Sequence, residues 1–466
     1  MSRRASTAHT PEALLAEAPL RALLRLAGPT TGVMSIAALS NVLHTYFVSR
    51  LGAEAIAAVS LVFPVSLILT TLMGGGIGAG VSSAVARALG AGKHGEATAV
   101  AEHAFALTAS IGGVLSVVLV AAAPGIFGLM GASGAVLTAA VAFSRVLFSG
   151  LLLTFFVNTC DSVLRGEGNV RVPAVCSSLS LVSQIVLTPL FMFRLGLGIR
   201  GAPAATLVGQ LIGAGPRVRH IFTGKAALRP RLVPRALRAA PLVEILRVGV
   251  PVSLGTLVNY LGMIVLTTIM ARFGTAELAA YGLGSRLDFV LLTVSYGTGV
   301  AVLTLVGFAA GAGRVDLAAG YARRAVLLMF GAVSVPALVL WWAPNLWFGL
   351  FTADPAIRSV GQTYFRIVGL SYPLIATSMM LAFAFQGIGR ATTPLVIMVV
   401  RISAVVTGAV VVSKSLGYGA AAIFALLAAG NCLSTALLSV AFVGSVRRLV
   451  RPVAATTRLA TSPADL

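Results

Sequence analysis

The chain has 466 residues, of which 58% are hydrophobic and only 10% are charged. Its mean hydropathy of +0.98 is far from the average of globular proteins and indicates a membrane protein rather than a soluble domain. The formal net charge of +21 would by itself suggest a nucleic-acid partner. Most of the 34 Lys and Arg, however, flank apolar stretches, as in membrane proteins with basic cytoplasmic loops.

Twelve apolar stretches are long enough to cross a bilayer. In chain order they are 22–48, 55–85, 98–124, 134–164, 172–196, 200–222, 242–271, 278–309, 325–349, 359–386, 393–416 and 419–445. Their length excludes a barrel of short alternating strands, so we expect an all-α membrane protein with twelve transmembrane helices. The residues before the first span lack a small-residue cleavage site and are not expected to be a signal peptide.

The sequence repeats itself at an offset of 221–222 residues. Gly52 corresponds to Gly274, and RGEGNVRVP at 165–173 corresponds to QGIGRATTP at 386–394. An offset that persists over most of the chain indicates two homologous halves. The expected domains are an N-terminal cytoplasmic segment (1–21), an N-lobe (22–222), a basic cytoplasmic linker (223–241), a C-lobe (242–445) and a cytoplasmic tail (446–466).

Each half has six expected spans, an even number, so both lobes have the same orientation in the membrane. We therefore expect a pseudo-two-fold axis along the membrane normal and a central cavity that opens alternately to the two sides. Pro29 and Pro251 lie at matching positions early in the first and seventh spans, where each removes a backbone hydrogen bond. They are candidate hinges, and a static bend is the alternative interpretation.

The densest basic run, residues 217–247, lies between the halves. We expect it to contact anionic lipid headgroups rather than nucleic acid. The excess of basic residues on this side predicts that both termini are cytoplasmic. The expected location is a bacterial-type cytoplasmic (inner) membrane, crossed many times.

The sequence lacks recognisable nucleotide-binding, catalytic and metal-binding motifs. There is no P-loop of the form GxxxxGK followed by Ser or Thr, and no convincing pair of nucleophile and base. The three Cys and five His have no metal-ligand spacing. We therefore expect neither an enzyme nor a cofactor or metal site. We expect transport to be driven by a gradient of H⁺ or Na⁺, by the gradient of the substrate itself, or by a partner.

Several segments resemble the multidrug and toxic compound extrusion (MATE) family, within the wider multidrug/oligosaccharidyl-lipid/polysaccharide exporter superfamily. They are LHTYFVSRLGAEAIAAVSL at 43–61, GAGVSSAVARALGAG at 78–92, LRGEGNVRVP at 164–173 and RGAPAAT at 200–206. The resemblance implies a V-shaped cavity between two lobes and export of small organic, often cationic, compounds against inward H⁺ or Na⁺. It also implies a protein that works in the lipid bilayer, and we expect it to function as a monomer.

The chain departs from the family where many members carry polar or acidic residues. His44 stands where the first span often has an Asp, and Gln184 and Thr188 replace an Asn and an Asp of the fifth span. The sixth-span Thr is kept as Thr206, and Asn259 replaces a seventh-span acid. A hard cation such as Na⁺ favours several oxygens and a carboxylate, so we do not expect an ordinary Na⁺ site in the N-lobe.

His44 and Asn41 are three residues apart on one predicted helix, so both can face a cavity together with Gln184 and Thr206. Since His titrates near neutrality, one hypothesis is that His44 replaces the acid as the proton-responsive group. The alternative is a neutral, hydrogen-bonded His packed inside the lobe.

Acids within the predicted spans are few, and ionisable groups at that depth are costly. Asp288 of the eighth span is the strongest candidate for cation or proton handling, with a local pair to Arg286 as the structural alternative. Asp161 lies near the cytoplasmic end of the fourth span, and we expect it to be solvated or paired with Arg165, four residues on.

Three arginines lie within predicted spans: Arg145 and Arg366 at matching repeat positions, and Arg401. We expect structural roles for them, either capping carbonyls or extending toward headgroups. Alternatively, arginines with few buried acids would suit an anionic substrate, which indicates a flippase for lipid-linked or other anionic molecules as the second candidate function. A receptor or scaffold is disfavoured because the longest soluble stretch is a short linker.

Overall fold

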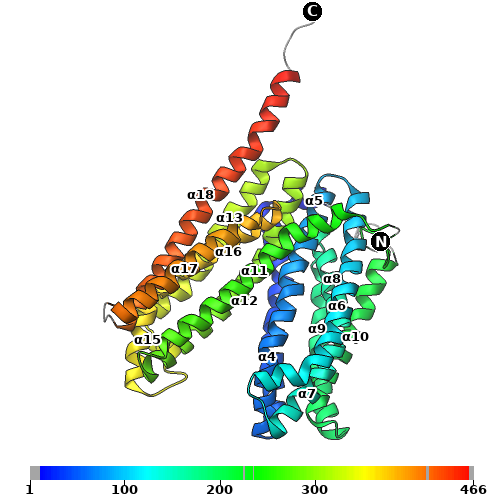
Figure 1. Ribbon diagram of the computed structural model, residues 1–466. Coiled ribbons are helices and arrows are strands. Elements are labelled where there is room, and N and C mark those ends of the chain that lie inside the picture. Colours follow the sequence, from blue (N-terminus) through cyan, green and yellow to red (C-terminus); the bar gives the residue numbers. More distant parts are fainter. Residues whose placement is uncertain (1–10, 224–225, 235, 416–418, 461–466) are drawn as a thin grey trace, which may run out of the picture. The chain divides into compact units, whose positions relative to one another are not determined.

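The computed structural model describes residues 11–223, 226–234, 236–415 and 419–460. Every regular element in this part of the chain is a helix, and none is a strand (Figure 1). The expected all-α fold is confirmed. Parts of the predicted N-terminal segment (1–10) and of the predicted tail (461–466) lie outside the described residues.

The N-terminal half contains helices α2 to α10 with three short irregular helices. They are α2 (Pro11–Ala16), α3 (Pro19–Ser49), α4 (Ala53–Thr70), the π-helix η2 (Thr71–Ile77), α5 (Gly78–Gly90), α6 (His94–Leu129), α7 (Gly134–Ser149), α8 (Leu151–Gly166), α9 (Arg171–Pro189), the π-helix η3 (Leu190–Arg194), the 3₁₀ helix η4 (Gly198–Arg200) and α10 (Gly201–Phe222).

The C-terminal half contains helices α11 to α18. They are α11 (Ala239–Met270), α12 (Thr275–Gly311), α13 (Val315–Trp342), α14 (Asn345–Phe348), α15 (Pro355–Ile367), the 3₁₀ helix η5 (Gly369–Ser371), α16 (Tyr372–Gly387), α17 (Thr392–Ser415) and α18 (Ala420–Ala460).

Ten helical segments of the described chain are long and apolar enough to cross a membrane. The pair α7 and α8, bent by 46° at their junction, provides an eleventh. The remaining expected span is α10, a helix of 22 residues whose Gly, Pro, Gln and Arg residues lower its hydropathy. The order of these segments along the chain follows the spans expected from the sequence.

The chain forms two compact units. One contains Arg25–Ser253 and the segment up to Glu17, and the other contains Ala18–Leu24 and the chain from Leu254 onward. The chain therefore passes from one unit to the other inside α3, four residues before Pro29, and inside α11, two residues after Pro251.

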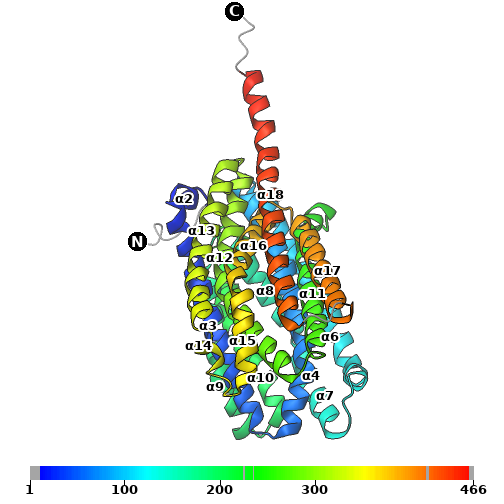
Figure 2. The same ribbon diagram turned by 90° about the vertical axis from the view of Figure 1, so that its left-hand side faces the viewer.

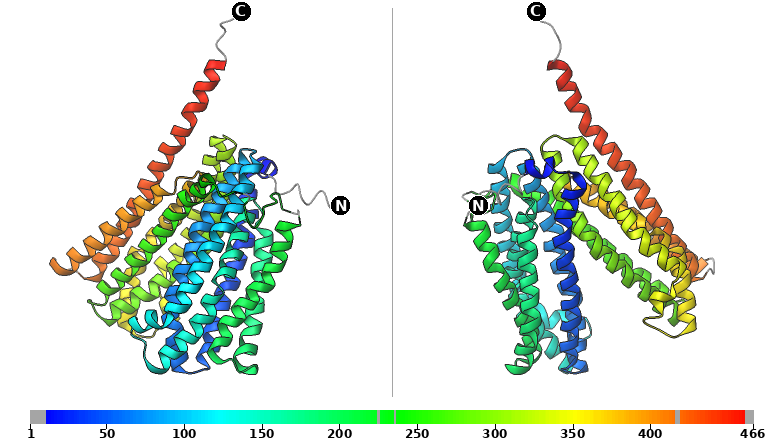
Figure 3. Two further views of the ribbon diagram at one scale, coloured as in Figure 1. Left: turned by 45° about the vertical axis from the view of Figure 1, so that its right-hand side comes forward. Right: turned by 180° about the vertical axis from the view of Figure 1, so that it is seen from behind.

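In the first unit, α6, α8, α9 and α10 run side by side (Figure 3). A GxxxG pair, Gly209 and Gly213, brings α10 close to α9. A Cβ at Gly213 would lie 2.0 Å from the Ser180 hydroxyl oxygen and 2.6 Å from the Cys176 carbonyl oxygen. Only a residue without a side chain fits at this contact, so the glycines determine how α9 and α10 pack.

In the second unit, α12, α13, α15, α16 and α18 pack together (Figure 2). An aromatic cluster at its centre joins Tyr364 and Phe365 of α15 with Tyr372 of α16 and Phe424 of α18. All four side chains are buried. Burial of such large rings is a major source of apolar stabilisation.

The repeat is also visible in the turns. Gly92 and Gly313 both have positive φ, at 71° and 70°, and Gly168 and Gly389 have 81° and 78°. These values lie in the left-handed region, which glycine adopts without a steric penalty. The two halves therefore share the backbone geometry of corresponding turns as well as sequence.

Candidate functional site

Three of the predicted polar residues of the N-terminal half lie on the neighbouring helices α9 and α10. Thr188 is 1% exposed, and its hydroxyl donates to the Gln184 carbonyl oxygen at 2.7 Å. The Thr206 hydroxyl donates to the Ala202 carbonyl oxygen at 3.2 Å. Because both hydroxyl hydrogens are used within their own helices, these threonines can offer only oxygen lone pairs to a ligand.

His44 and Asn41 lie on α3. Asn41 is exposed, whereas His44 is half-buried and packs edge-on against Phe143 of α7, with 6.2 Å between the ring centroids. Among the described residues, no hydrogen bond joins either side chain to Gln184, Thr188 or Thr206. Both interpretations of His44, as a proton-responsive group and as a neutral histidine packed inside the lobe, therefore stay predictions.

The C-terminal half holds a more developed polar cluster, centred on Asp288 of α12. The Tyr364 hydroxyl lies 3.5 Å from Asp288 Oδ2, a long hydrogen bond. Asp288 Oδ1 and the Tyr372 hydroxyl are buried and have no hydrogen-bond partner among the described residues. Asp288 as a whole is half-buried, but a carboxylate with one buried oxygen and so few bonds is costly. It would gain from a bound proton or cation.

Arg401 of α17 belongs to the same unit but bonds elsewhere. Its Nη1 donates to Asn431 Oδ1 at 3.1 Å, and Asn431 Nδ2 donates to the Ser371 hydroxyl oxygen at 2.9 Å. Arg401 therefore stabilises a polar chain between α17, α18 and η5. It neither caps a helix carbonyl nor extends to headgroups as we expected, because an amide partner is available inside the unit.

The local pair between Asp288 and Arg286, which was the structural alternative for this acid, is not the contact observed. Arg286 is exposed and lies over the ring of Phe351, 6.0 Å from its centroid. Residues two apart on a helix point in different directions, which explains why the two side chains diverge. Asp288 faces the tyrosines of α15 and α16 instead.

Asp161 also has a different setting from the one we expected. It is 6% exposed rather than solvated, and the cation bonded to it is Arg217 of α10. Arg217 Nε donates to Asp161 Oδ1 at 2.7 Å and Nη2 donates to Oδ2 at 3.2 Å.

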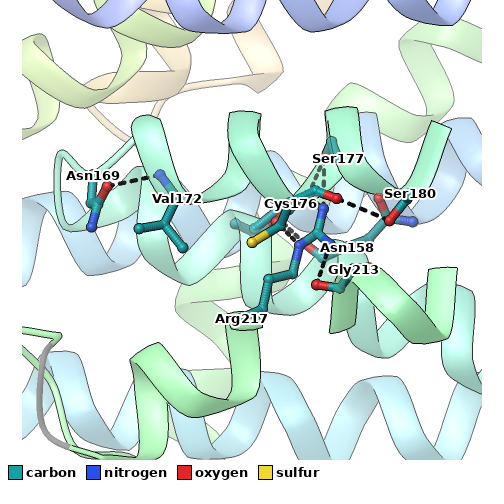
Figure 4. A network of polar contacts seen from close by, with 10 residues as sticks. Asn158, Asn169, Val172, Cys176, Ser177, Ser180, Gly213 and Arg217 are labelled. Atoms are coloured by element: carbon teal, nitrogen blue, oxygen red, sulfur yellow. Dashed lines mark hydrogen bonds and ion pairs between the residues drawn. The ribbon is translucent and has the colours of Figure 1, made fainter. Parts of the chain in front are cut away.

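Arg217 completes its bonds with Ser177 and the Gly213 carbonyl group (Figure 4). With 1% exposure it is buried, so the assignment of residue 217 to the lipid-facing basic run was wrong. The long apolar stretch before Arg217 was the only sequence signal for its burial.

The other predicted residues are placed as follows. Arg145 of α7 and Arg366 of α15 are exposed, which fits contact with lipid or solvent. Asn259 of α11 is half-buried. Pro29 and Pro251 lie inside α3 and α11. Among the described residues, no group of three or more His, Cys, Asp or Glu is arranged to hold a metal ion.

The MatE family model matches residues 29–190 and again residues 251–411. The two matches begin 222 residues apart and end 221 residues apart, which confirms the duplication. The FAD transporter of Shewanella oneidensis is 28% identical over 407 residues, or 83% of this chain and 87% of that protein. The probable multidrug resistance protein NorM of Thermotoga maritima is 26% identical over 392 residues, or 82% of each chain.

Solved structures of transporters are similar along almost the whole chain. A MATE protein in the bent conformation has a TM-score of 0.89 at 27% identity, and the match covers 95% of this chain and 98% of that one. A MOP superfamily transporter from Pyrococcus furiosus, for which the reverse polarity of the binding pocket suggests a different function, has a TM-score of 0.86 at 26% identity. That match covers 94% of this chain and 98% of the other.

Proposed function

Because the chain belongs to the MatE family, we propose that it is a secondary active exporter that moves organic compounds outward in exchange for an inward-moving cation. Members of the family are transporters rather than enzymes, and this chain is a multi-pass membrane protein. The proposal includes alternating access, and a cytoplasmic membrane with both termini on the inner side.

The observation that carries the coupling proposal is the incomplete bonding of Asp288. One of its oxygens has a single 3.5 Å contact, and the other has no partner among the described residues. Binding of one proton to the Asp288 carboxylate is enough to neutralise its charge. Na⁺, in contrast, favours coordination by several oxygen atoms. With His44 and Thr188 in place of family acids, the N-terminal half offers no carboxylate at those positions. We therefore favour H⁺ over Na⁺.

Pro29 and Pro251 support movement between two states of the exporter. Each lies within about one helical turn of a point where the chain passes between the two compact units. A proline leaves a helix without one backbone hydrogen bond at that point, which lowers the cost of bending there. We propose that these two sites are the hinges of alternating access.

The experiment uses the full chain reconstituted in vesicles, with efflux of a cationic dye measured under a pH gradient, a Na⁺ gradient and neither. We expect transport with the pH gradient and its loss in Asp288→Asn, while the exposed acid variant Asp316→Asn stays active. Transport that requires Na⁺ and is unaffected by pH would contradict H⁺ coupling. Full activity of Asp288→Asn would remove Asp288 from the mechanism.

A second candidate is transport of anionic compounds, including lipid-linked ones. One argument for it is the presence of three arginines within the predicted spans, Arg145, Arg366 and Arg401. The other is the similarity to a protein named an FAD transporter, since the FAD molecule contains a negatively charged diphosphate. The same vesicles loaded with FAD distinguish the candidates. Efflux of FAD but not of cationic dyes would replace the first proposal's substrate class.

A further inference from the structure

The linker between the halves is fastened to the first unit by its backbone. Glu167, which directly follows α8, is 4% exposed, and its two carboxylate oxygens accept the N–H groups of Ala227 and Leu228, each at 3.1 Å. The Leu228 side chain is 1% exposed, and Ala226 packs on a buried apolar cluster that includes Phe105. The start of the linker therefore has a fixed place.

Two residues of α6 hold the rest of the linker. Glu102 Oε1 accepts the Arg231 N–H at 3.0 Å, and His103 Nε2 accepts the Arg238 N–H at 2.9 Å. His103 Nδ1 lies 2.7 Å from the Ala99 carbonyl oxygen, so the network assigns the proton to Nδ1 and a lone pair to Nε2. We call residues 226–234 and 236–238 the tethered linker.

The position of these contacts along α6 places the tethered linker at the membrane surface. Glu102 and His103 are the last ionisable residues of α6, and the 26 residues from Ala104 to Leu129 contain none. At a rise of 1.5 Å per residue this apolar run is about 39 Å long, enough to cross a hydrocarbon layer of about 30 Å. Glu102 and His103 thus lie near the edge of that layer, and so does the backbone they bind.

Leu228 and Pro230 are buried against the protein, whereas most side chains of the tethered linker from residue 231 onward are exposed. Leu232, Val233 and Leu237 are 54%, 76% and 75% exposed. Arg229, Arg231 and Arg238 between and beside them are exposed as well. Apolar side chains interleaved with arginines at this depth match the two parts of an anionic bilayer surface, since the chains enter the acyl boundary and the guanidinium groups bind phosphate.

We propose that the tethered linker is a fixed membrane anchor that binds anionic phospholipid of the inner leaflet. Leu232, Val233 and Leu237 enter the boundary between headgroups and acyl chains, and the three arginines pair with lipid phosphates. Because Glu102, His103 and Glu167 already order the backbone, little conformational entropy is lost when lipid binds.

The test is a fluorescent label on Val233→Cys of the full chain, with the exposed Cys432 replaced by Ala. The protein is placed in vesicles of phosphatidylcholine alone or with one third phosphatidylglycerol. A matched label on Glu96→Cys reports on an exposed site of α6 six residues before Glu102, about 9 Å farther from the apolar run. Iodide in the water and bromine on the lipid chains are the two quenchers.

In vesicles with phosphatidylglycerol we expect the label at 233 to emit at shorter wavelength. Its fluorescence should be quenched by the brominated chains and little by iodide. The fluorescence of the label at 96 should still be quenched by iodide. Each arginine near an anionic surface is worth about fivefold in binding. The variant Arg229→Gln/Arg231→Gln/Arg238→Gln should therefore lose most of the dependence on phosphatidylglycerol.

Equal access of iodide to both labels in both lipids would overturn the proposal. Protection that appears only after soluble cell extract is added would also overturn it, because the partner would then be a protein. If the triple variant does not fold, Leu232→Ser and Leu237→Ser with the same label test the apolar part. Neither variant changes a residue assigned to transport, so loss of the anchor and failure of the proposed export are separable.

Discussion

Asp161→Asn tests whether the buried pair with Arg217 stabilises the first unit. The substitution keeps the size of the side chain and removes its charge. Arg217 then stays buried at 1% exposure, with the two bonds to the carboxylate at 2.7 and 3.2 Å weakened or lost. Bonds to Ser177 and Gly213 remain, but neither group carries a compensating charge.

The expected cost follows from the uncompensated charge. Breaking a buried ion pair by removing one partner costs about 3–5 kcal/mol. For a unit of roughly 150–250 residues, each kcal/mol lowers Tm by about 2–4 °C, so we expect Asp161→Asn to lower Tm by roughly 6–20 °C. Ser177→Ala removes one bond to the guanidinium group and a long 3.4 Å bond to Asp161 Oδ2, and it should cost less, about 1.5–3 kcal/mol.

The assay is thermal unfolding of purified protein in detergent at one fixed heating rate, because such unfolding is often irreversible. Asp316→Asn, an exposed acid at the start of α13, is the matched control and should leave Tm within about 1 °C. The double variant Asp161→Leu/Arg217→Met should recover most of the loss, since apolar replacement of a whole buried pair is often neutral. A decrease in Tm smaller than about 2 °C for Asp161→Asn would refute this reasoning. So would a double variant whose decrease in Tm equals the sum of the decreases in the two single variants.

Three further outcomes are expected. Burial raises the pKa of Glu167 from 4.5 to about 7, so the stability that this group contributes is complete below pH 4.5 and is lost as the pH rises through 7. Glu167→Gln should make the decrease in Tm between pH 6 and 8 smaller. An unchanged slope of Tm against pH would contradict this role of Glu167. Gly213→Ala should cost about 1–3 kcal/mol by forcing α9 and α10 apart, measured as a lower Tm, whereas Gly215→Ala, at a glycine with open space around it, is the control. His44→Ala should change the pH profile of efflux if His44 carries the proton, and an unchanged profile at equal expression would end that hypothesis.

The sequence predicts the helices and the repeat well because both depend on local patterns. Apolar runs determine the spans, and the glycines of matching turns, such as Gly168 and Gly389, share the same backbone geometry. Contacts between distant segments were harder to predict. Reasoning along one helix paired Asp161 with Arg165, but the bonded partner is 56 residues away in sequence, on α10.

The linker illustrates the same limit. Its basic composition indicated a solvated segment near lipid, and nothing in that pattern predicts that Glu167 accepts N–H groups 60 and 61 residues away. Such bonds use the backbone of the linker, so they leave no trace in its side-chain pattern. Likewise, the sequence indicates Asp288 as the strongest candidate for ion handling. Its tyrosine neighbours on α15 and α16 cannot be predicted in the same way, because they depend on how the helices pack.

Two acids of the described membrane-spanning helices, Asp161 and Asp288, differ in their bonding, and this difference gives a final prediction. Both oxygens of Asp161 accept bonds from Arg217, whereas Asp288 has one long contact and an oxygen without a partner among the described residues. Neither acid is repeated, because the offset aligns Asp161 with Ala382 and Asp288 with Ser66. The first acid is therefore neutralised within the protein, and under our coupling proposal the second binds a mobile proton.

Asp161→Asn and Asp288→Asn should consequently fail in opposite ways. Asp161→Asn should lower Tm strongly and keep transport per folded molecule, because it touches packing alone. Asp288→Asn should lose coupled efflux and keep or raise Tm, since a neutral amide replaces a carboxylate that is costly to bury without partners. The two measurements are Tm in detergent and initial efflux rate normalised to folded protein. If Asp288→Asn unfolds the protein as Asp161→Asn does, Asp288 is a structural acid, and its assignment to coupling is wrong.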